Sequence, residues 1–209
     1  MGNRCLIATE NKDLGVYLHW NGGRDSVEAF LKYCELQGYR TPETDSYGWA
    51  RLCQVIGNFF GGSTSIGISK YFDMDEDNGI YIIRDWKIVG RKNLYEGFVE
   101  QKEYDLEEML KEIDEHQPAH MQLGKFLDAE EVDVNDIEVG DIVFMQEYNG
   151  KYEQFTVVGF GKDKVVNGLN VRGIPYVNKY ENDGSYENNI NNFIRTKKIR
   201  RLGKQGGEE

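Results

Sequence analysis

Residues 15–31 decide the first part of the fold, and they read Gly15-Val16-Tyr17-Leu18-His19-Trp20-Asn21-Gly22-Gly23-Arg24-Asp25-Ser26-Val27-Glu28-Ala29-Phe30-Leu31. Residues 15–20 alternate in character as a strand does, and Asn21-Gly22-Gly23 ends that strand. A helical pattern follows, with an apolar face made of Val27, Phe30, Leu31 and Cys34. We expect Asp25 to cap this helix, Glu28 to complete a capping box, and Gly38 to end the helix.

Outward from this stretch, the pattern predicts an α+β domain over residues 1–127. Residues 4–8 read as a strand that forms an N-terminal hairpin with residues 15–20. A second helix is capped by Asp45 and ends at Gly61-Gly62. Alternation of period two then predicts a meander of strands over residues 65–71, 79–84 and 87–91. We therefore expect an antiparallel sheet with two to three helices.

The next part of the chain is acidic and helical. Residues 104–127 carry an apolar stripe that consists of Leu106, Met109, Leu110 and Ile113. Pro118 ends or kinks this helix, because proline has no amide hydrogen to donate. Residues 128–135 read as a linker.

Short strands separated by turn residues fill the region that follows. The best hairpin turn in the chain is Asn149-Gly150, which favours a two-residue loop. The spacing of these strands predicts a small SH3-like β-barrel over residues 128–194. Residues 195–209 form a basic tail, with cationic side chains at Arg195, Lys197, Lys198, Arg200, Arg201 and Lys204.

The composition indicates a globular protein. The chain has 209 residues, including 13 Tyr, 10 Phe and 3 Trp, which is too much aromatic surface for a disordered chain. No apolar run approaches the roughly 20 residues that span a bilayer, so we expect no membrane contact and a cytoplasmic location. The 3 Cys stand too far apart for a disulfide framework or a zinc site, and Cys34 and Cys53 fall on apolar helix faces.

Negative charge is concentrated in one segment of a chain whose net charge is −11. Such a field repels nucleic acid and attracts basic protein surfaces. A solvated helix face is the simpler interpretation of the same pattern. If the segment binds a partner, the candidate contact residues are Glu103, Asp105, Glu107, Glu108, Glu112, Asp114, Glu115, Asp128, Glu130, Glu131, Asp133 and Asp136.

Two patterns suggest metal ligands, and neither has the required spacing. Residues 73–79 alternate carboxylates before a glycine, but an EF-hand needs Gly at its sixth position and Glu at its twelfth, where this chain has Asn78 and Arg84. His116 and His120 are four residues apart, but Pro118 lies between them. We predict no metal and no cofactor.

A possible pocket lies where the strand at 15–20 meets the first helix. Its candidate residues are Tyr17, His19, Trp20 and Arg24. A phosphate group could bind Asn21-Gly22-Gly23-Arg24 at the helix start, although the Gly pair is also explained as punctuation. His19 could pair with Cys5 or Cys34, but a structural role for a strand histidine is the more common case.

The run 15–31, together with Tyr47-Gly48-Trp49-Ala50-Arg51-Leu52 and Asn58-Phe59-Phe60-Gly61-Gly62, resembles uncharacterised proteins carried by phages and mobile elements of Gram-positive gut bacteria. The resemblance covers the α+β part of the chain and brings no catalytic residues with it. It implies a setting, since acidic phage proteins of this kind include inhibitors of bacterial defence systems. Among these are anti-CRISPR proteins, which occupy the nucleic-acid channel of a nuclease.

Three functional hypotheses follow. In the first, the chain is a non-enzymatic acidic protein that binds a basic host protein, such as a nucleic-acid-guided nuclease, in the host cytosol. In the second, it acts on a nucleotide or small molecule at residues 17–24. In the third, it contacts nucleic acid through the C-terminal β region and the basic tail. The sequence contains no nucleophile elbow and no catalytic-cysteine signature, which favours binding over catalysis.

Overall fold

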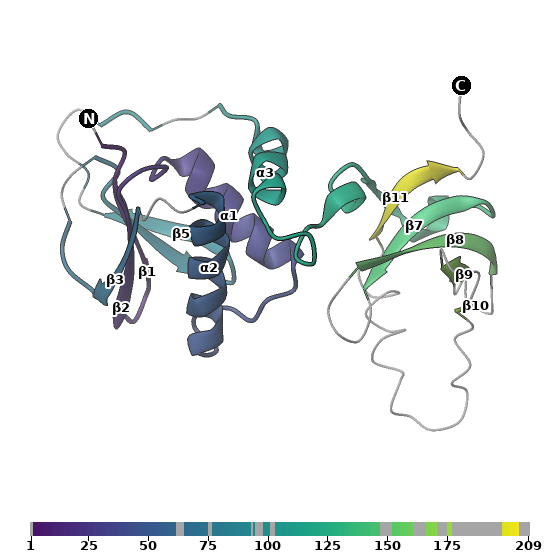
Figure 1. Cartoon of the computed structure of the whole chain (residues 1–209), viewed down its shortest axis with the longest axis horizontal. Coiled ribbons are helices and arrows are strands. Elements are labelled where there is room, and N and C mark those ends of the chain that lie inside the picture. Colours follow the sequence, from purple (N-terminus) through teal and green to yellow (C-terminus); the bar gives the residue numbers. More distant parts are fainter. Residues whose placement is uncertain are drawn as a thin grey trace. The chain divides into compact units, whose positions relative to one another are not determined.

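The computed structural model describes residues 2–61, 65–74, 77–92, 94, 98–100, 103–146, 152–160, 166–170, 175–176 and 198–204 (Figure 1). The chain divides into two compact units, Met1–Gln122 and Leu123–Glu209. The predicted boundary lies a few residues later, after residue 127. The predicted turn at Asn149-Gly150 lies outside the described residues.

A five-stranded sheet forms the first unit, in the order β3-β2-β1-β4-β5. Its strands are β1 (Cys5–Thr9), β2 (Leu14–Leu18), β3 (Ile66–Lys70), β4 (Ile80–Arg84) and β5 (Lys87–Lys92). The hairpin of β1 and β2 confirms the sequence prediction. All neighbours are antiparallel except β1 and β4, which pair in parallel.

The predicted meander of β3, β4 and β5 is wrong in its first step. β3 pairs with β2, whereas β4 pairs with β1 on the other side of the hairpin. The reason is visible in β1, whose five residues are all buried and which therefore needs a strand on each side. Only β4 and β5 form the expected hairpin.

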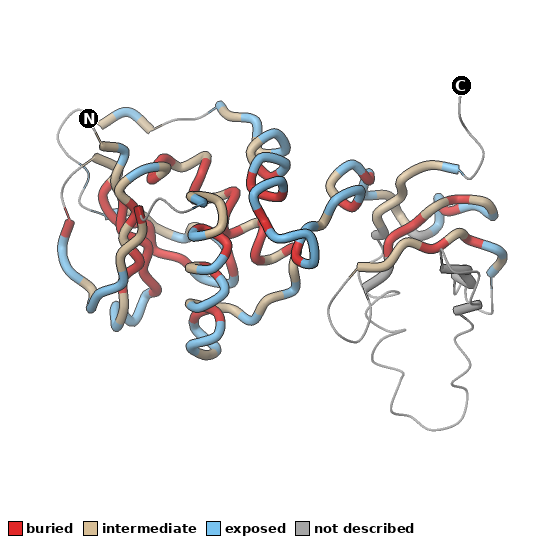
Figure 2. The backbone as a smooth tube through the Cα atoms, in the orientation of Figure 1, coloured by how far each residue is buried: buried red, intermediate tan, exposed pale blue. Residues whose placement is uncertain are grey.

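Three helices lie on the same side of this sheet (Figure 1). They are α1 (Arg24–Leu36), α2 (Ser46–Phe59) and α3 (Leu106–Glu115). Apolar side chains of α1, such as Phe30 and Leu31, are fully buried. Figure 2 shows that buried residues recur along the helices and the central strands of this unit. Two contiguous helices before β3 and one after β5 therefore give an α+β fold, as predicted.

A second apolar cluster lies on the other face of the sheet. Side chains alternate along a strand, so Leu6 and Ala8 point away from the face that Ile7 occupies. Leu6 and Ala8 pack with Ile80, Ile82 and Met74, and all five are buried. Met74, which follows β3, thus packs on the face of the sheet that the helices leave open.

Helix boundaries follow the sequence signals in part. The side chain of Asp45 accepts a hydrogen bond from the Tyr47 amide at 2.8 Å, which confirms the predicted cap of α2. Gly38 and Gly61 adopt φ values of 68° and 62°, the left-handed conformation that ends a helix. The predicted capping box at Asp25 is wrong, because α1 begins at Arg24, two residues before the start that a cap at Asp25 requires, and its N-cap residue Gly23 has no side chain to cap it.

The third helix ends just before Pro118, which is one of the two effects predicted for that proline. It ends at Glu115 rather than at residue 127, and residues Gly124–Phe126 form a separate 3₁₀ turn, η1. Pro118 explains the early end, since it cannot donate the next helical hydrogen bond and disfavours helical geometry in the residue before it. The side chain of Asp105 caps the start of α3 by accepting a hydrogen bond from the Glu108 amide at 2.9 Å.

The second unit contains a six-stranded antiparallel sheet in the order β10-β9-β8-β7-β11-β6. Its apolar cluster consists of Ile137, Val143, Phe155 and Val157. The described strands form no closed barrel, so the SH3-like architecture stays a prediction. The strands are β6 (Glu130–Asp133), β7 (Asp141–Gln146), β8 (Tyr152–Phe160), β9 (Val166–Asn170), β10 (Pro175–Tyr176) and β11 (Lys198–Lys204), and η2 (Val134–Asp136) is a 3₁₀ turn.

Two segments of this unit are strands where the sequence predicts none. The expected linker at 128–135 contains β6, and the expected basic tail contains β11. β11 lies between β7 and β6 and pairs with both. A strand of carboxylates thus lies beside a strand of cations, with Arg201 opposite Glu130 and Arg200 opposite Glu131.

Candidate functional site

The exposed surface of α3 and of the residues just before it is strongly acidic. We call this surface the α3 acidic face, and it consists of Glu103, Asp105, Glu107, Glu108, Glu112 and Glu115. All six residues are exposed (Figure 2). None of them forms an ion pair with a cation in the described part of the chain. Glu107 and Glu108 lie in the first helical turn, where the helix dipole favours negative charge.

Asp114 was predicted to belong to this surface, but the structure places it in the interior. Its side chain is buried and accepts a hydrogen bond from the Tyr33 hydroxyl at 2.5 Å. Burial and the neighbouring Asp114 carboxylate both raise the pKa of Tyr33, so the hydroxyl keeps its proton. The pair therefore joins α3 to α1 and does not face a partner.

Gln117 fixes the end of α3 to α2. Its amide nitrogen donates to the carbonyl oxygens of Val55 and Ile113, each at 3.1 Å. Its amide oxygen accepts a hydrogen bond from Asn58 at 2.9 Å. Polar contacts thus attach α3, which carries the α3 acidic face, to both α1 and α2.

The predicted contact residues beyond α3 have a different environment. Glu130 accepts hydrogen bonds from Arg201 at 2.5 and 2.9 Å, and Lys204 lies 2.5 Å from Glu138. Lys204 lowers the pKa of Glu138, which marks the carboxylate as its charge partner. Asp136 is exposed, and Asp128, Glu131 and Asp133 also interact with other residues. Two basic residues of β11, Arg201 and Lys204, therefore pair with Glu130 and Glu138 of the second unit.

The four predicted pocket residues separate into two groups. The Tyr17 hydroxyl lies 3.0 Å from Nδ1 of His19, and the rings of His19 and Trp20 meet edge to face at 5.0 Å. Trp20 is 44% exposed. Arg24 instead contacts Glu28 and Glu100. The structure thus brings together the rings of Tyr17, His19 and Trp20, whereas Arg24 contacts other residues.

The predicted pairing of His19 with a cysteine is not found among the described contacts. Cys5 and Cys34 are fully buried, and burial raises the pKa of each thiol. A thiol whose pKa is raised forms little of the nucleophilic thiolate at neutral pH. These cysteines are core residues, as the apolar helix face indicates for Cys34.

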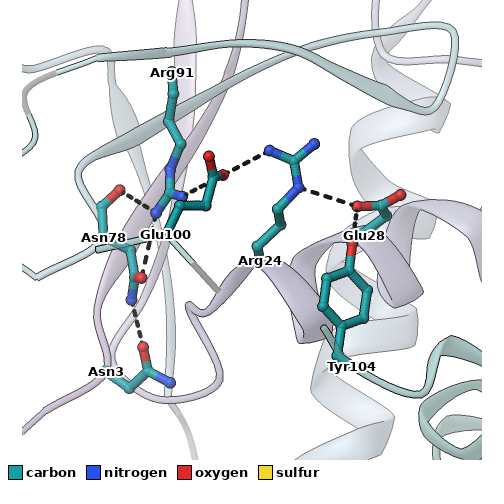
Figure 3. A network of polar contacts seen from close by, with 7 residues as sticks. All are labelled: Asn3, Arg24, Glu28, Asn78, Arg91, Glu100 and Tyr104. Atoms are coloured by element: carbon teal, nitrogen blue, oxygen red, sulfur yellow. Dashed lines mark hydrogen bonds and ion pairs between the residues drawn. The ribbon is translucent and has the colours of Figure 1, made fainter. Parts of the chain in front are cut away.

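Arg24 belongs to a network of charged and polar side chains (Figure 3). Oε1 of Glu100 accepts hydrogen bonds from Arg24 at 2.6 Å and from Arg91 at 2.9 Å. On its other side, Arg24 donates to Glu28 at 3.3 Å, and the Tyr104 hydroxyl donates to the same Glu28 oxygen. The Glu100 carboxylate, which lies in the segment that leads to α3, therefore joins that segment to β5 and to the start of α1.

Arg91 is the most deeply buried cation of this network. Its side chain is only 9% exposed, and its guanidinium lies 4.2 Å from the ring centre of Tyr81 and 4.6 Å from that of Phe98. It also donates to the Asn78 carbonyl oxygen at 2.9 Å. The hydrogen bond from Arg24, followed by that from Arg91, lowers the pKa of Glu100, which favours the ionised carboxylate.

Sequence reasoning does not identify Arg91, Glu100 or Asn78 as site residues. Arg91 reads as the polar end of a strand, and Glu100 lies in a stretch without a periodic pattern. The one signal in the sequence is the positive charge of Arg91 near the end of a predicted strand. That signal does not reveal a partner.

The candidate metal ligands are engaged elsewhere. Asp77 accepts a hydrogen bond from the Arg4 amide at 3.0 Å, and Asp73 accepts one from the Tyr71 hydroxyl at 3.2 Å. Nδ1 of His116 donates to the Glu112 carbonyl oxygen at 2.8 Å. Within the described ranges, no group of His, Cys, Asp and Glu side chains is arranged to hold a metal ion. Residues 75 and 76 lie outside those ranges.

Gly22 has a packing role at the predicted phosphate site. A Cβ atom at this position would lie 2.6 Å from the Asn3 carbonyl oxygen and 2.7 Å from the Cys5 amide nitrogen. The Gly22 amide donates to the same Asn3 oxygen at 2.7 Å, so it does not face a ligand. The glycine lets the chain pass close to β1.

Among the helices of the described chain, none has both the length and the apolar character that a membrane crossing requires. Comparison of this chain with protein-family models, with curated proteins and with solved structures gives no match in any of the three.

Proposed function

We propose that this chain is a non-enzymatic binding protein whose α3 acidic face docks on a basic surface of a partner protein. The partner that fits this chemistry is a nucleic-acid-dependent complex, whose basic groove normally receives phosphates. In this proposal the chain acts as a phage-type, anti-CRISPR-like inhibitor in the host cytosol. The α3 acidic face fills the groove by charge complementarity.

The observation that carries the proposal is the unequal pairing of carboxylates in the two units. In the second unit, Arg201 and Lys204 lie against Glu130 and Glu138. On α3, the exposed carboxylates have no such cation among the described residues. Carboxylates that no described cation pairs with attract a basic surface at long range and raise the association rate.

The density of this charge resembles that of a nucleic acid strand. A helix rises about 1.5 Å per residue, so residues 105–115 span about 15 Å. Five exposed carboxylates and Lys111 lie in this span, which gives about one net negative charge per 3–4 Å. B-DNA carries one phosphate per about 3.4 Å along each strand. A groove that accepts phosphates can therefore accept this helix face.

The two other hypotheses have weaker support. The structure groups Tyr17, His19 and Trp20 but directs Arg24 elsewhere, so the proposed small-molecule pocket is incomplete. Arg201 and Lys204 already contact carboxylates of their own unit, which weakens nucleic-acid contact through the basic tail. Its residues 195–197 lie outside the described part of the chain.

Charge reversal on α3 tests the proposal. The variant E107K/E108K/E112K/E115K inverts the face without changing a buried residue. The control variant E10K/D13K/E43K/D85K makes the same change in net charge at exposed positions away from α3. Circular dichroism and the thermal midpoint establish that both variants fold.

Binding is measured by pull-down from a host lysate treated with nuclease, followed by identification of the retained proteins. We expect wild type and the control variant to retain a basic protein, and the α3 variant to lose it. Added nucleic acid should compete with the wild type for the same protein. If the folded α3 variant binds as well as the wild type does, the α3 acidic face is not the docking surface.

A further inference from the structure

We propose that Arg24 and Arg91 form an oxyanion-binding site that Glu100 occupies in this structure, and that a phosphate group can take the place of Glu100. The phosphate is either inorganic phosphate or the phosphate of a phosphomonoester. This inference is independent of the function proposed for α3, because it uses none of the carboxylates of the α3 acidic face.

The geometry of the two arginines is that of a receptor for an anion. Arg24 comes from the start of α1 and Arg91 from β5, and both donate to one oxygen of Glu100 (Figure 3). Two guanidinium groups that converge on one oxygen are arranged to bind an anion with several oxygens in the same place. Arginine is well suited to this because its planar donors match phosphate.

Arg91 keeps its position through contacts that do not involve Glu100. Its side chain is nine-tenths buried, and its guanidinium contacts the rings of Tyr81 and Phe98. The Asn78 carbonyl oxygen accepts a further hydrogen bond from it. Because these contacts remain when Glu100 leaves, the site is preorganised for another anion.

Part of the donor capacity around the site is unused. Nε of Arg91 and the hydroxyl of Tyr81 are buried and have no hydrogen-bond partner among the described residues. Burial raises the pKa of Tyr81, and the charges of Arg91 and Glu100 also act on it, so this hydroxyl lies in the electrostatic surroundings of the site. Buried polar groups of native proteins normally have partners, and a partner absent from the chain can be a ligand.

Glu100 can leave more easily than Arg91 can move. The side chain of Glu100 is 37% exposed and that of Arg24 is 32% exposed, so water reaches the ion pair that a ligand must replace. Glu100 is tethered, and a tethered group competes at an effective concentration on the order of millimolar. A competitor therefore needs more charge or more acceptors than one carboxylate, which favours phosphate over a simple carboxylic acid.

The test is a titration of the full chain with inorganic phosphate, measured by isothermal titration calorimetry. We expect E100A to bind phosphate at least tenfold more tightly than wild type, because the internal competitor is gone. The matched control is E10A, which removes the carboxylate partner of the exposed Arg84 but leaves a single arginine. E10A should bind phosphate no better than wild type.

The double variant R24A/E100A should bind phosphate at least tenfold more weakly than E100A does. A second titration uses phosphoserine. If phosphoserine binds E100A more tightly than inorganic phosphate does, the site is one for phosphomonoesters. If it binds more weakly, the site is one for free phosphate. Acetate should bind E100A more weakly than either. The proposal is overturned if E100A and wild type have the same phosphate affinity, or if R24A/E100A binds as E100A does. E100Q replaces E100A in these titrations if circular dichroism shows that E100A is unfolded.

Discussion

The hydroxyl of Tyr33 on α1 and the carboxylate of Asp114 on α3 form a buried hydrogen bond of 2.5 Å. Asp114 is the one carboxylate of α3 that points into the protein, while the carboxylates around it in the helix are exposed. The acidic helix is therefore attached to the core through one of its own acidic residues.

Removal of the Tyr33 hydroxyl should destabilise the first unit. Y33F leaves the buried Asp114 carboxylate without this donor, which should cost about 1–3 kcal/mol in the free energy of unfolding. Urea denaturation measures the change. Y47F is the matched control, because Tyr47 is 64% exposed, and it should unfold as wild type does. Equal stability of Y33F and wild type would show that the bond does not hold α3.

A Gly22 substitution should be costly, while Gly57 in α2 should tolerate the same change. G22A places a methyl group 2.6 Å from a backbone oxygen, so we expect a loss of about 1–3 kcal/mol in unfolding free energy. In G57A the new methyl group meets no atom within 4 Å, and alanine favours the helix by about 0.5–1 kcal/mol. Thermal unfolding of the two variants should move in opposite directions.

The ion pairs of Glu100 should make stability depend on pH. Arg24 and then Arg91 lower the pKa of Glu100 below its ordinary value of 4.5. The resulting stabilisation is complete above the unfolded pKa and is lost as the pH falls through the folded pKa. E100Q should therefore be less stable than wild type at pH 7, by less than about 1 kcal/mol because solvent screens the pair.

The stability difference between E100Q and wild type should shrink as the pH falls below 4.5. Urea denaturation across this pH range measures it. E10Q provides the control for a carboxylate on the surface, at the exposed ion pair with Arg84. A difference that stays constant with pH would mean that the Glu100 charge does not stabilise the fold.

The thiols should react in an order set by burial. Cys53 is half-buried and its pKa is raised to about 11, whereas Cys5 and Cys34 are fully buried. We expect a thiol reagent at pH 8 to label Cys53 slowly and first. In denaturant, all three cysteines should react at one rate. C53S should abolish the first phase, and an early phase that survives in C53S would place an exposed thiol elsewhere.

Arg201 should matter more to the second unit than Lys204 does. Arg201 lies 3.7 Å from Asp141, whose side chain is fully buried, and it also binds Glu130. R201A leaves Asp141 without this cation and should cost about 1–2 kcal/mol in unfolding free energy. Lys204 pairs with an exposed carboxylate, so K204A should leave the thermal midpoint unchanged. Equal effects of the two variants would contradict this ranking.

Features that depend on neighbouring residues could be predicted from the sequence. The cap at Asp45, the turn at Gly38 and the hairpin of β1 and β2 all arise from local chemistry. The start of α1 is a boundary that local chemistry did not predict. There Glu28 binds Arg24 and the distant Tyr104, so the local capping box does not form.

Features that depend on distant residues could not be predicted in the same way. The parallel pairing of Leu6 with Ile80 joins segments with two helices between them. The basic residues of β11 read as a tail because their partners in β6 lie far earlier in the chain. Of the predicted pocket residues, Arg24 lies in the network of Figure 3, but Arg91 and Glu100 have no local pattern that marks them.

The position of β11 has a consequence for how the protein forms during synthesis. β6 is an edge strand whose one described neighbour is β11, and Arg201 follows Glu130 by 71 residues. At about 5–20 residues per second, a ribosome needs roughly 4–14 s to make the intervening chain. The first unit can complete its sheet and helices in that interval. The acidic strand β6 meanwhile stays unpaired until the nascent chain delivers its basic neighbour.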